Sequence, residues 1–316
     1  MSSLRDYLHN TIVLQSFHPF GIFLSKKGIH VEPISIVIPA YNEAAAIAET
    51  VREIRRVLSE SGIEGEIVIV DDGSTDNTSE AVAQTDARLI RHPHNRGYGA
   101  SLKTGIRQAQ NDVIVIIDAD GTYPIDAIPA LAEKMSAYDM VVGARTGATV
   151  QVPMLRRPAK WMLNRLANYL SGVEIPDLNS GLRAFRKNVA IGFFRLLPSG
   201  FSFTTSITLA MLTNDYNVLY IPVNYYKRVG KSKIRPLQDT INFFSLVVRM
   251  VLSYRPLRVF IPMIAALGLV TFAKAIYDIN AYDWHFATST VILFTLTFQV
   301  IVLGLIADLV VSLHKT

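Results

Sequence analysis

The C-terminal part of the chain contains an uncharged stretch, Phe286 to Ala307, that is 22 residues long. As a helix this stretch would be roughly 33 Å long, enough to cross the hydrocarbon core of a bilayer. A second uncharged run, Val259 to Ala273, becomes long enough when it extends through Lys274 to Tyr277, with the Lys274 ammonium reaching toward the interface. The alternative is a pair of buried core helices. The length and uniform apolarity of the longer run favour a two-helix transmembrane hairpin.

Basic residues flank this predicted hairpin. Arg249, Arg255 and Arg258 lie before or at the start of the first run, and Lys315 follows the second. Because cytoplasmic flanks carry an excess of Lys and Arg, the sequence predicts an integral, multi-pass membrane protein in which the domain before the hairpin is cytoplasmic. Membrane lipids are therefore expected partners. A homo-oligomer that associates through the hairpin remains open.

The overall composition narrows the class of protein. Half of the residues are hydrophobic and the mean hydropathy is +0.28, with the excess concentrated after residue 240. The formal net charge of +5 suits an anionic lipid or a phosphorylated substrate. No Lys/Arg run of domain length with interleaved aromatic residues is present, so nucleic acid is not an expected partner. The absence of cysteine excludes disulfides and thiolate metal sites.

Before the hairpin, short apolar runs alternate with helical patterns. Strands are predicted at Ile34–Ile38 (ended by Pro39), Glu66–Val70, Arg88–Arg91, Val113–Ile117, Met140–Val142 and Val218–Ile221. Helices are predicted over 44–60, from about Asp76, over Ser101–Gln110 and over about 126–137, with two short helices inside 177–235. This alternation is typical of an α/β fold with a mostly parallel, Rossmann-like sheet.

These patterns predict four parts of the chain. Residues 1–33 form a lead-in of unknown role, and residues 34–235 form the catalytic α/β domain. Residues 236–256 are expected to be an amphipathic interfacial helix, and residues 257–316 the transmembrane hairpin.

Three polar clusters follow three of the predicted strands: Pro39–Glu43, Asp71–Asp76 and Asp118–Asp120. In parallel α/β sheets, ligands bind beyond the carboxyl ends of the strands. Asp118 and Asp120, one residue apart at a strand end, are suited to share a hard divalent cation such as Mg²⁺ or Mn²⁺. A cation bound there would neutralise charge on a leaving diphosphate. Each cluster alone is also compatible with a solvated turn, but the ordered set of three indicates an enzyme.

The motifs VIPAYNE (Val37–Glu43), VDDGSTD (Val70–Asp76) and DADG (Asp118–Gly121) resemble the hallmarks of family 2 glycosyltransferases with a GT-A fold. The resemblance covers about residues 34–235. Within that family, Asp177–Arg183 (DLNSGLR) and Arg228–Lys233 (RVGKSK) resemble the branch that loads sugars onto polyprenyl phosphates, such as dolichol-phosphate mannose synthases. Thr122 stands where those synthases commonly have Gln, which leaves the identity of the sugar open.

The resemblance implies roles for individual residues. The nucleoside would be held by Pro39, Tyr41, Glu43 and one of Asp71 or Asp72. Asp118 and Asp120 would bind the divalent metal and the donor diphosphate. Apart from the resemblance, Arg145 lies in the half of the domain expected to hold the acceptor, and it completes the expected catalytic set. The activity implied is transfer of a hexose from a nucleotide sugar, of the GDP-mannose or UDP-glucose type, to a polyprenyl phosphate at the cytosolic membrane face.

General chemistry also favours a phosphate acceptor. A phosphate monoester is already an anionic nucleophile at neutral pH, so its site needs cations more than a general base. Arg183, Arg228, Lys231 and Lys233 are the expected acceptor-phosphate cations. For the 227–235 segment, binding of lipid headgroups is an equally good interpretation.

Two other functions stay open from the sequence. One is a different family 2 membrane enzyme that elongates a glycan or glycosylates another lipid. The other, from a different class, is a catalytically inactive membrane scaffold, against which the intact Asp118 and Asp120 argue.

Overall fold

The structure is a computed structural model. It describes residues 31–146, 165, 167–169, 172–200, 202–226, 248, 251–252, 255–281 and 285–313. Several expectations lie outside these residues: the lead-in up to residue 30, the cations Arg228, Lys231 and Lys233, and most of the predicted interfacial helix at 236–256.

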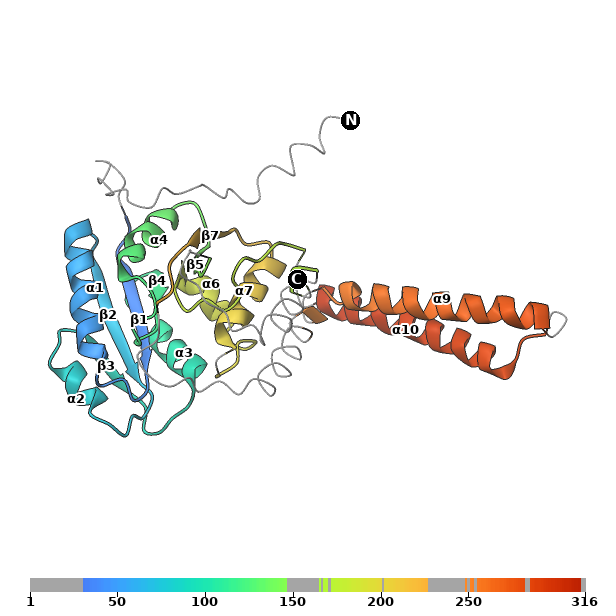
Figure 1. The fold of residues 1–316 in the computed structure, drawn as a ribbon, viewed down its shortest axis with the longest axis horizontal. Helices are drawn as coiled ribbons and strands as arrows, with labels where there is room; N and C mark the ends of the chain where they lie inside the picture. The colour runs from blue at the N-terminus through green and yellow to red at the C-terminus, as the bar shows by residue number, and fades with distance from the viewer. Residues whose placement is uncertain are drawn as a thin grey trace, which may run out of the picture.

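The part of the chain before the hairpin is built on one seven-stranded sheet (Figure 1). The strands are β1 (Ile34–Ala40), β2 (Gly65–Asp71), β3 (Arg88–Arg91), β4 (Val113–Ile116), β5 (Met140–Ala144), β6 (Arg183–Arg186) and β7 (Val218–Pro222). Their order across the sheet is β3-β2-β1-β4-β6-β5-β7. Strand β6 runs antiparallel to both of its neighbours, whereas the other pairs are parallel. The prediction of a mostly parallel α/β sheet is confirmed.

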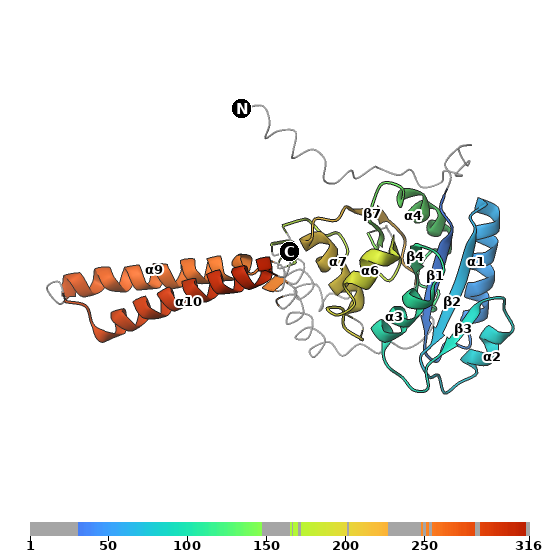
Figure 2. The same ribbon diagram turned by 180° about the vertical axis from the view of Figure 1, so that it is seen from behind.

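Helices cover both faces of the sheet (Figures 1 and 2). They are α1 (Ile47–Ser61), α2 (Thr78–Ala83), α3 (Tyr98–Gln108), α4 (Ile128–Lys134, preceded by the 3₁₀ turn η2, Ile125–Ala127), α6 (Lys187–Gly192) and α7 (Phe203–Thr213). Alternate β1 residues enter different cores: Ile36 and Ile38 pack with α1 and α4, and Val37 packs with α3 and α7. Because successive side chains of a strand point to opposite faces, the sheet packs against helices on both sides and the domain has three layers, helix, sheet and helix.

Two local predictions need correction. Pro39 does not end the first strand, because β1 continues to Ala40 and pairs Pro39 with Val70 of β2. Ala40 faces β2, where its carbonyl accepts the Asp72 N–H at 2.8 Å. Pro39 therefore faces β4, whose pairing with β1 already ends at Val37, so its missing N–H costs no ladder hydrogen bond. Strand β6 was not predicted, because its four residues, RAFR, lack a strand-like apolar pattern.

The C-terminal helices α9 (Leu257–Ala281) and α10 (Thr288–Leu313) lie side by side and project away from the sheet (Figure 1). Among the described residues these two helices are long and apolar enough to cross a membrane, with mean hydropathies of 2.1 and 2.4. Most of their surface is exposed, unlike that of core helices. The predicted two-helix hairpin is confirmed.

Polar contacts join the two hairpin helices. Near the outer end, Asp278 accepts hydrogen bonds from Thr290 Oγ1 at 2.6 Å and from the Ala287 backbone N–H at 2.8 Å. Lys274 forms an ion pair with the same carboxylate. The sequence predicts that the Lys274 ammonium reaches toward the membrane interface, but in the structure its partner is Asp278. Nearer the middle, the hydroxyls of Thr271 and Thr297 lie 3.0 Å apart.

The hairpin base is attached to the catalytic part. Val251 is buried in a cluster with Ile175, Leu209 and Ala210, and Val259 packs against the same cluster. Arg255 pairs with Asp215 at 2.6 Å. The segment that enters the hairpin is therefore in direct contact with α7 and with the loop that precedes β6.

Helix α3 approaches the sheet closely because residue 105 is glycine. A Cβ atom at Gly105 would lie 2.4 Å from Val37 Cγ1 and 3.1 Å from Val70 Cγ2. Gly105→Ala should therefore destabilise the fold by about 1–3 kcal/mol through overpacking, despite the better helix propensity of alanine. Thermal unfolding of the full chain in detergent measures this as a lower Tm. Gly192→Ala in α6 is the matched control, since a Cβ there meets nothing within 4 Å. Equal Tm values for the two variants would contradict the close packing of α3.

Candidate active site

The carboxyl ends of β1, β2 and β4 meet at one edge of the sheet, as the parallel register requires. The loops that follow β1 and β2 are joined by hydrogen bonds. The Asn42 backbone N–H donates to Ser74 Oγ at 2.9 Å, and Asn42 Oδ1 accepts the Thr75 N–H at 2.9 Å. The Glu43 N–H donates to Thr78 Oγ1 at 2.9 Å. These contacts hold Tyr41 and Glu43, both half-buried, at the edge of the sheet.

Asp71 is buried and fixes the turn that follows β2. Its Oδ1 accepts the Ser74 N–H at 2.9 Å, and its Oδ2 accepts a hydrogen bond from the Ser79 hydroxyl. Arg91 Nε lies 3.7 Å from the same Oδ2.

Asp72 is also buried and holds a different loop. Its carboxylate accepts the backbone N–H groups of Arg96 at 2.9 Å and Gly97 at 2.8 Å. His92 Nδ1 lies 2.7 Å from Asp72 Oδ1, and His92 Nε2 lies 3.0 Å from Thr104 Oγ1. Asp71 thus holds the turn after β2, and Asp72 holds the loop before α3. The sequence interpretation assigned no role to His92, because nothing local shows that a histidine 20 residues away reaches Asp72.

Asp118 lies immediately beyond β4 and contacts two elements from other parts of the chain. The Tyr98 hydroxyl donates to Asp118 Oδ1 at 2.9 Å. Burial, and then the nearby Asp118 carboxylate, raise the pKa of Tyr98 well above its ordinary value, so this hydroxyl keeps its proton at neutral pH. A Cβ atom at Gly181 would lie 2.4 Å from Asp118 Oδ2, so only glycine allows the backbone to come this close.

Asp120 is held by the residue that follows the motif. Its Oδ1 accepts hydrogen bonds from Thr122 Oγ1 at 2.6 Å and from the Thr122 N–H at 3.2 Å. Within the described residues no group of three or more His, Cys, Asp or Glu side chains is placed to hold a metal ion. Two carboxylates are still a suitable donor set for Mg²⁺ or Mn²⁺, because Mg²⁺ is usually held by one or two carboxylates together with substrate phosphates and water.

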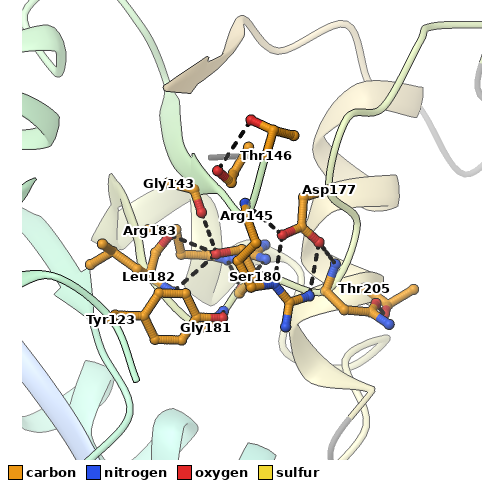
Figure 3. A network of polar contacts seen from close by, with 12 residues as sticks. Tyr123, Gly143, Arg145, Thr146, Asp177, Ser180, Gly181, Leu182, Arg183 and Thr205 are labelled. Atoms are coloured by element: carbon orange, nitrogen blue, oxygen red, sulfur yellow. Dashed lines mark hydrogen bonds and ion pairs between the residues drawn. The ribbon is translucent and has the colours of Figure 1, made fainter. Parts of the chain in front are cut away.

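Arg145, just beyond β5, is fixed by a bidentate ion pair with Asp177 (Figure 3). Arg145 Nε and Nη2 donate to the two oxygens of Asp177 at 2.7 and 2.9 Å, and the Arg145 backbone N–H donates at 3.0 Å. The guanidinium lies over the Tyr225 ring, 5.2 Å from its centroid.

The ion pair also sets the protonation of both groups. Burial alone would raise the pKa of Asp177, but its hydrogen bonds and charge interaction with Arg145 outweigh burial and lower it. The Asp177 carboxylate therefore contributes to stability at neutral pH, and this contribution is lost only as the pH falls below about 4. Burial would lower the pKa of Arg145, but the bonds to Asp177 raise it, so Arg145 is a permanent cation.

Arg183 is fully buried, unlike Arg145. Its guanidinium donates to the Ser180 carbonyl from Nε at 3.1 Å and from Nη2 at 2.5 Å (Figure 3). Its Nη1 donates to the Thr204 carbonyl at 2.9 Å and to Thr208 Oγ1 at 2.7 Å. Arg183 thus joins the loop before β6 to the first turns of α7. With no exposed surface, it is not placed for the direct phosphate contact expected from the sequence.

The structure thus places Asp118 and Arg145 beside the loop before β6. Asp120 is held by Thr122, two residues farther along its own loop, and Asp71 and Asp72 anchor the neighbouring loops. Sequence reasoning gave no role to the residues that orient them, which are His92, Tyr98, Tyr123 and Asp177. All four act through contacts that are distant in sequence. Asp177 alone had a local signal, the turn-rich DLNSG stretch in which it lies.

Family models match two parts of the chain. The model described as glycosyl transferase family 2 matches residues 35–194, about half of the chain. A second, described as the GtrB C-terminal hairpin, matches residues 255–313.

Curated relatives and solved structures agree with these matches. The chain is 29% identical over 226 residues to the dolichyl-phosphate hexose transferase of Haloferax volcanii, covering 71% of this chain and 96% of that protein. It is 33% identical over 163 residues to the undecaprenyl-phosphate 4-deoxy-4-formamido-L-arabinose transferase of Pseudomonas fluorescens, covering 49% of this chain and 47% of that protein.

Among solved structures, glucosyl-3-phosphoglycerate synthase from Mycobacterium tuberculosis, determined with Mn²⁺, UDP and phosphoglyceric acid, matches with a TM-score of 0.56. The match has 18% identity and covers 70% of this chain and 78% of that one, so it bears on the fold alone. The fold of the catalytic part is thus of the GT-A type expected from the sequence.

The Asp72 network gives a stability prediction. Asp72→Ala removes the acceptor of two backbone N–H groups and the partner of His92, each of which would cost about 1–3 kcal/mol if left unsatisfied. We expect a fall in Tm of at least about 4 °C for the full chain in detergent. Asp86→Ala removes an exposed aspartate that pairs with Arg55 and should change stability by no more than about 0.5 kcal/mol. Equal Tm values for the two variants would contradict the anchoring role of Asp72.

Proposed function

We propose that this chain, which belongs to glycosyl transferase family 2, transfers a hexose from a nucleotide sugar to a polyprenyl phosphate at the cytosolic face of a membrane. One observation carries the proposal: the permanent cation Arg145 and the Asp118 carboxylate, which belongs to the same DADG motif as Asp120, border one short loop before β6. The printed names of relatives that act on dolichyl and undecaprenyl phosphates support this acceptor class. The attached hairpin supports a lipid-linked substrate.

On the donor side, we assign the nucleoside to the edge formed by Pro39, Tyr41 and Glu43, with one of Asp71 or Asp72 beside it. The interlocked loops after β1 and β2 support this assignment, since they hold the edge rigid before the donor binds. The donor is a GDP-mannose or UDP-glucose type of nucleotide sugar.

Asp118 and Asp120 are assigned to a divalent metal, Mg²⁺ or Mn²⁺, shared with the donor diphosphate. The bound ion would supply charge neutralisation on the leaving diphosphate. The chain's own part is to keep the two carboxylates in place, through Tyr98 for Asp118 and Thr122 for Asp120.

On the acceptor side, a phosphate oxygen of the lipid attacks the anomeric carbon of the sugar. The new bond is the carbon–oxygen bond to the lipid phosphate, and the carbon–oxygen bond to the nucleoside diphosphate breaks, with the electron pair leaving on the diphosphate. A phosphate dianion needs no proton removed, so no carboxylate is assigned as a base. Arg145 supplies positive charge close to the reacting phosphates.

Other cations are assigned by position. Arg183 is proposed to act indirectly, by fixing the Ser180 carbonyl and α7, because its guanidinium is buried. Arg228, Lys231 and Lys233 lie outside the described residues and remain proposed contacts to the acceptor phosphate. Helices α9 and α10 are proposed to span the membrane with the catalytic part in the cytoplasm, on the basis of the flanking Arg and Lys residues.

A donor panel tests the proposed function. Purified full-length protein is incubated with GDP-mannose, UDP-glucose, UDP-galactose or UDP-GlcNAc, a short-chain prenyl phosphate and Mg²⁺ or Mn²⁺. We expect transfer from one donor to give a glycosylated prenyl phosphate. Transfer only to a glycan or to a lipid without phosphate would replace the proposed acceptor. Absence of both transfer and donor hydrolysis would favour a scaffold.

Asp120→Asn tests the metal assignment. We expect loss of nearly all transfer activity with the fold intact. The metal would lose a carboxylate ligand and would no longer neutralise the charge that develops on the diphosphate. The rate is measured across a Mn²⁺ titration, with Tm as the control for folding. A wild-type rate with an unchanged metal requirement would refute the assignment.

Arg228→Ala tests the phosphate-clamp role of the 227–235 segment. A lost charge-assisted hydrogen bond is worth roughly 1.5–3 kcal/mol, so the KM for prenyl phosphate should rise about tenfold to a hundredfold while the KM for nucleotide sugar changes little. The short-chain acceptor in detergent removes the contribution of a membrane surface. An unchanged acceptor KM would leave only a role in binding lipid headgroups.

A further inference from the structure

We propose that Asp177 is a positioning residue for the transfer reaction, because it fixes the Arg145 guanidinium in a closed ring of contacts that includes Gly181, the neighbour of the Asp118 carboxylate. The inference rests on the proposed function and adds to it the residue that determines where the reactive cation lies. Asp177 itself is not expected to touch either substrate.

The first half of the ring consists of contacts to Arg145. Asp177 binds two guanidinium nitrogens and the backbone N–H of Arg145, so it fixes both ends of that side chain (Figure 3). The guanidinium also lies over the Tyr225 ring, whose centroid is 5.2 Å away. Contacts to a carboxylate and to an aromatic ring together leave the long Arg145 side chain little rotational freedom.

The second half of the ring runs from Tyr225 to Gly181, which lies beside Asp118. The Tyr225 ring packs edge-on against Tyr123, with centroids 5.3 Å apart. The Tyr123 hydroxyl accepts the Gly181 N–H at 2.6 Å (Figure 3). Gly181 lies directly against the Asp118 carboxylate. The loop from Asp177 to Gly181 closes the ring, and the Asn179 N–H donates to Asp177 Oδ1 at 3.2 Å inside it.

This arrangement explains the largely buried ion pair of Arg145 and Asp177, whose side chains are 22% and 4% exposed, better than stability alone does. Taking two charges out of water costs free energy that their attraction often fails to recover, so a buried pair is weak evidence for stabilisation. A cation fixed in advance relative to the Asp118 carboxylate lowers the reorganisation needed when charge moves between two phosphates. Asp177 is also a poor candidate for a general base, since its oxygens are occupied by Arg145 and Asn179 and its pKa is lowered.

A kinetic double-mutant cycle tests the proposal on the full-length protein in detergent. The variants are Asp177→Asn, Arg145→Ala and the two combined, assayed with a nucleotide sugar and a short-chain prenyl phosphate. We expect Asp177→Asn to lower kcat about tenfold to a hundredfold, with the KM for nucleotide sugar changed less than about twofold. In the Arg145→Ala background the same substitution should cost less than about twofold, because its effect passes through Arg145.

The possible results separate the proposal from its premise. An equal loss from Asp177→Asn in both backgrounds would overturn the positioning role and leave the proposed function intact. A wild-type rate for Arg145→Ala would overturn the assignment of Arg145, and the positioning role with it. Glu60→Gln, which removes the charge of an exposed pair with Arg56 on α1, is the matched control and should leave kcat unchanged.

A second pair of variants keeps the test valid if Asp177→Asn does not fold. Tyr225→Phe retains the ring beneath the guanidinium, whereas Tyr225→Leu removes it. We expect Tyr225→Phe to keep the wild-type kcat within about twofold. Tyr225→Leu should lower kcat severalfold, and only when Arg145 is present. A loss from Tyr225→Leu that persists unchanged in the Arg145→Ala background would contradict the proposed ring.

Discussion

The antiparallel pairing of β6 with β4 is the constraint on which the candidate site depends. The register places Arg183 opposite Ile116, two residues before Asp118. The chain that enters β6 must therefore pass beside the end of β4, and Gly181 makes this passage sterically possible. As a result, the loop that carries Asp177 lies next to Asp118, although 59 positions separate the two aspartates in the sequence. The buried guanidinium of Arg183 holds this arrangement by binding the Ser180 carbonyl and α7.

The same loop links the candidate site to the C-terminal hairpin. Ile175 and Leu178, on either side of Asp177, are buried with Leu209 of α7 and with Val251, which precedes the hairpin. Arg258 at the start of α9 donates to the Tyr169 carbonyl at 3.2 Å. One hydrophobic cluster therefore supports both the base of the hairpin and the loop that positions Arg145. A lipid-linked acceptor held at the membrane surface would approach the site from this side of the molecule.

The sequence predicted the parts of the protein that depend on local patterns. Apolar runs placed the strands of the parallel sheet, and the uncharged stretch from Phe286 placed the second hairpin helix. The clusters at Pro39–Glu43, Asp71–Asp76 and Asp118–Asp120 were expected to converge, because parallel strands end at a common edge. Contacts that join distant segments left no local pattern. The four residues of β6 are too short and too polar to indicate a strand, and the partners of Asp72 and Arg145 lie 20 or more positions away.

Under the proposed function, one edge of the sheet holds the donor diphosphate and the acceptor phosphate together. Relaxation of the ³¹P signal of a short-chain prenyl phosphate, measured with protein, nucleoside diphosphate and Mn²⁺, tests it most directly, because the paramagnetic effect falls steeply with distance. We expect strong relaxation that requires the nucleoside diphosphate and disappears in an Asp118→Asn, Asp120→Asn double variant. Relaxation no faster than in that double variant would show that the two phosphates do not share this site.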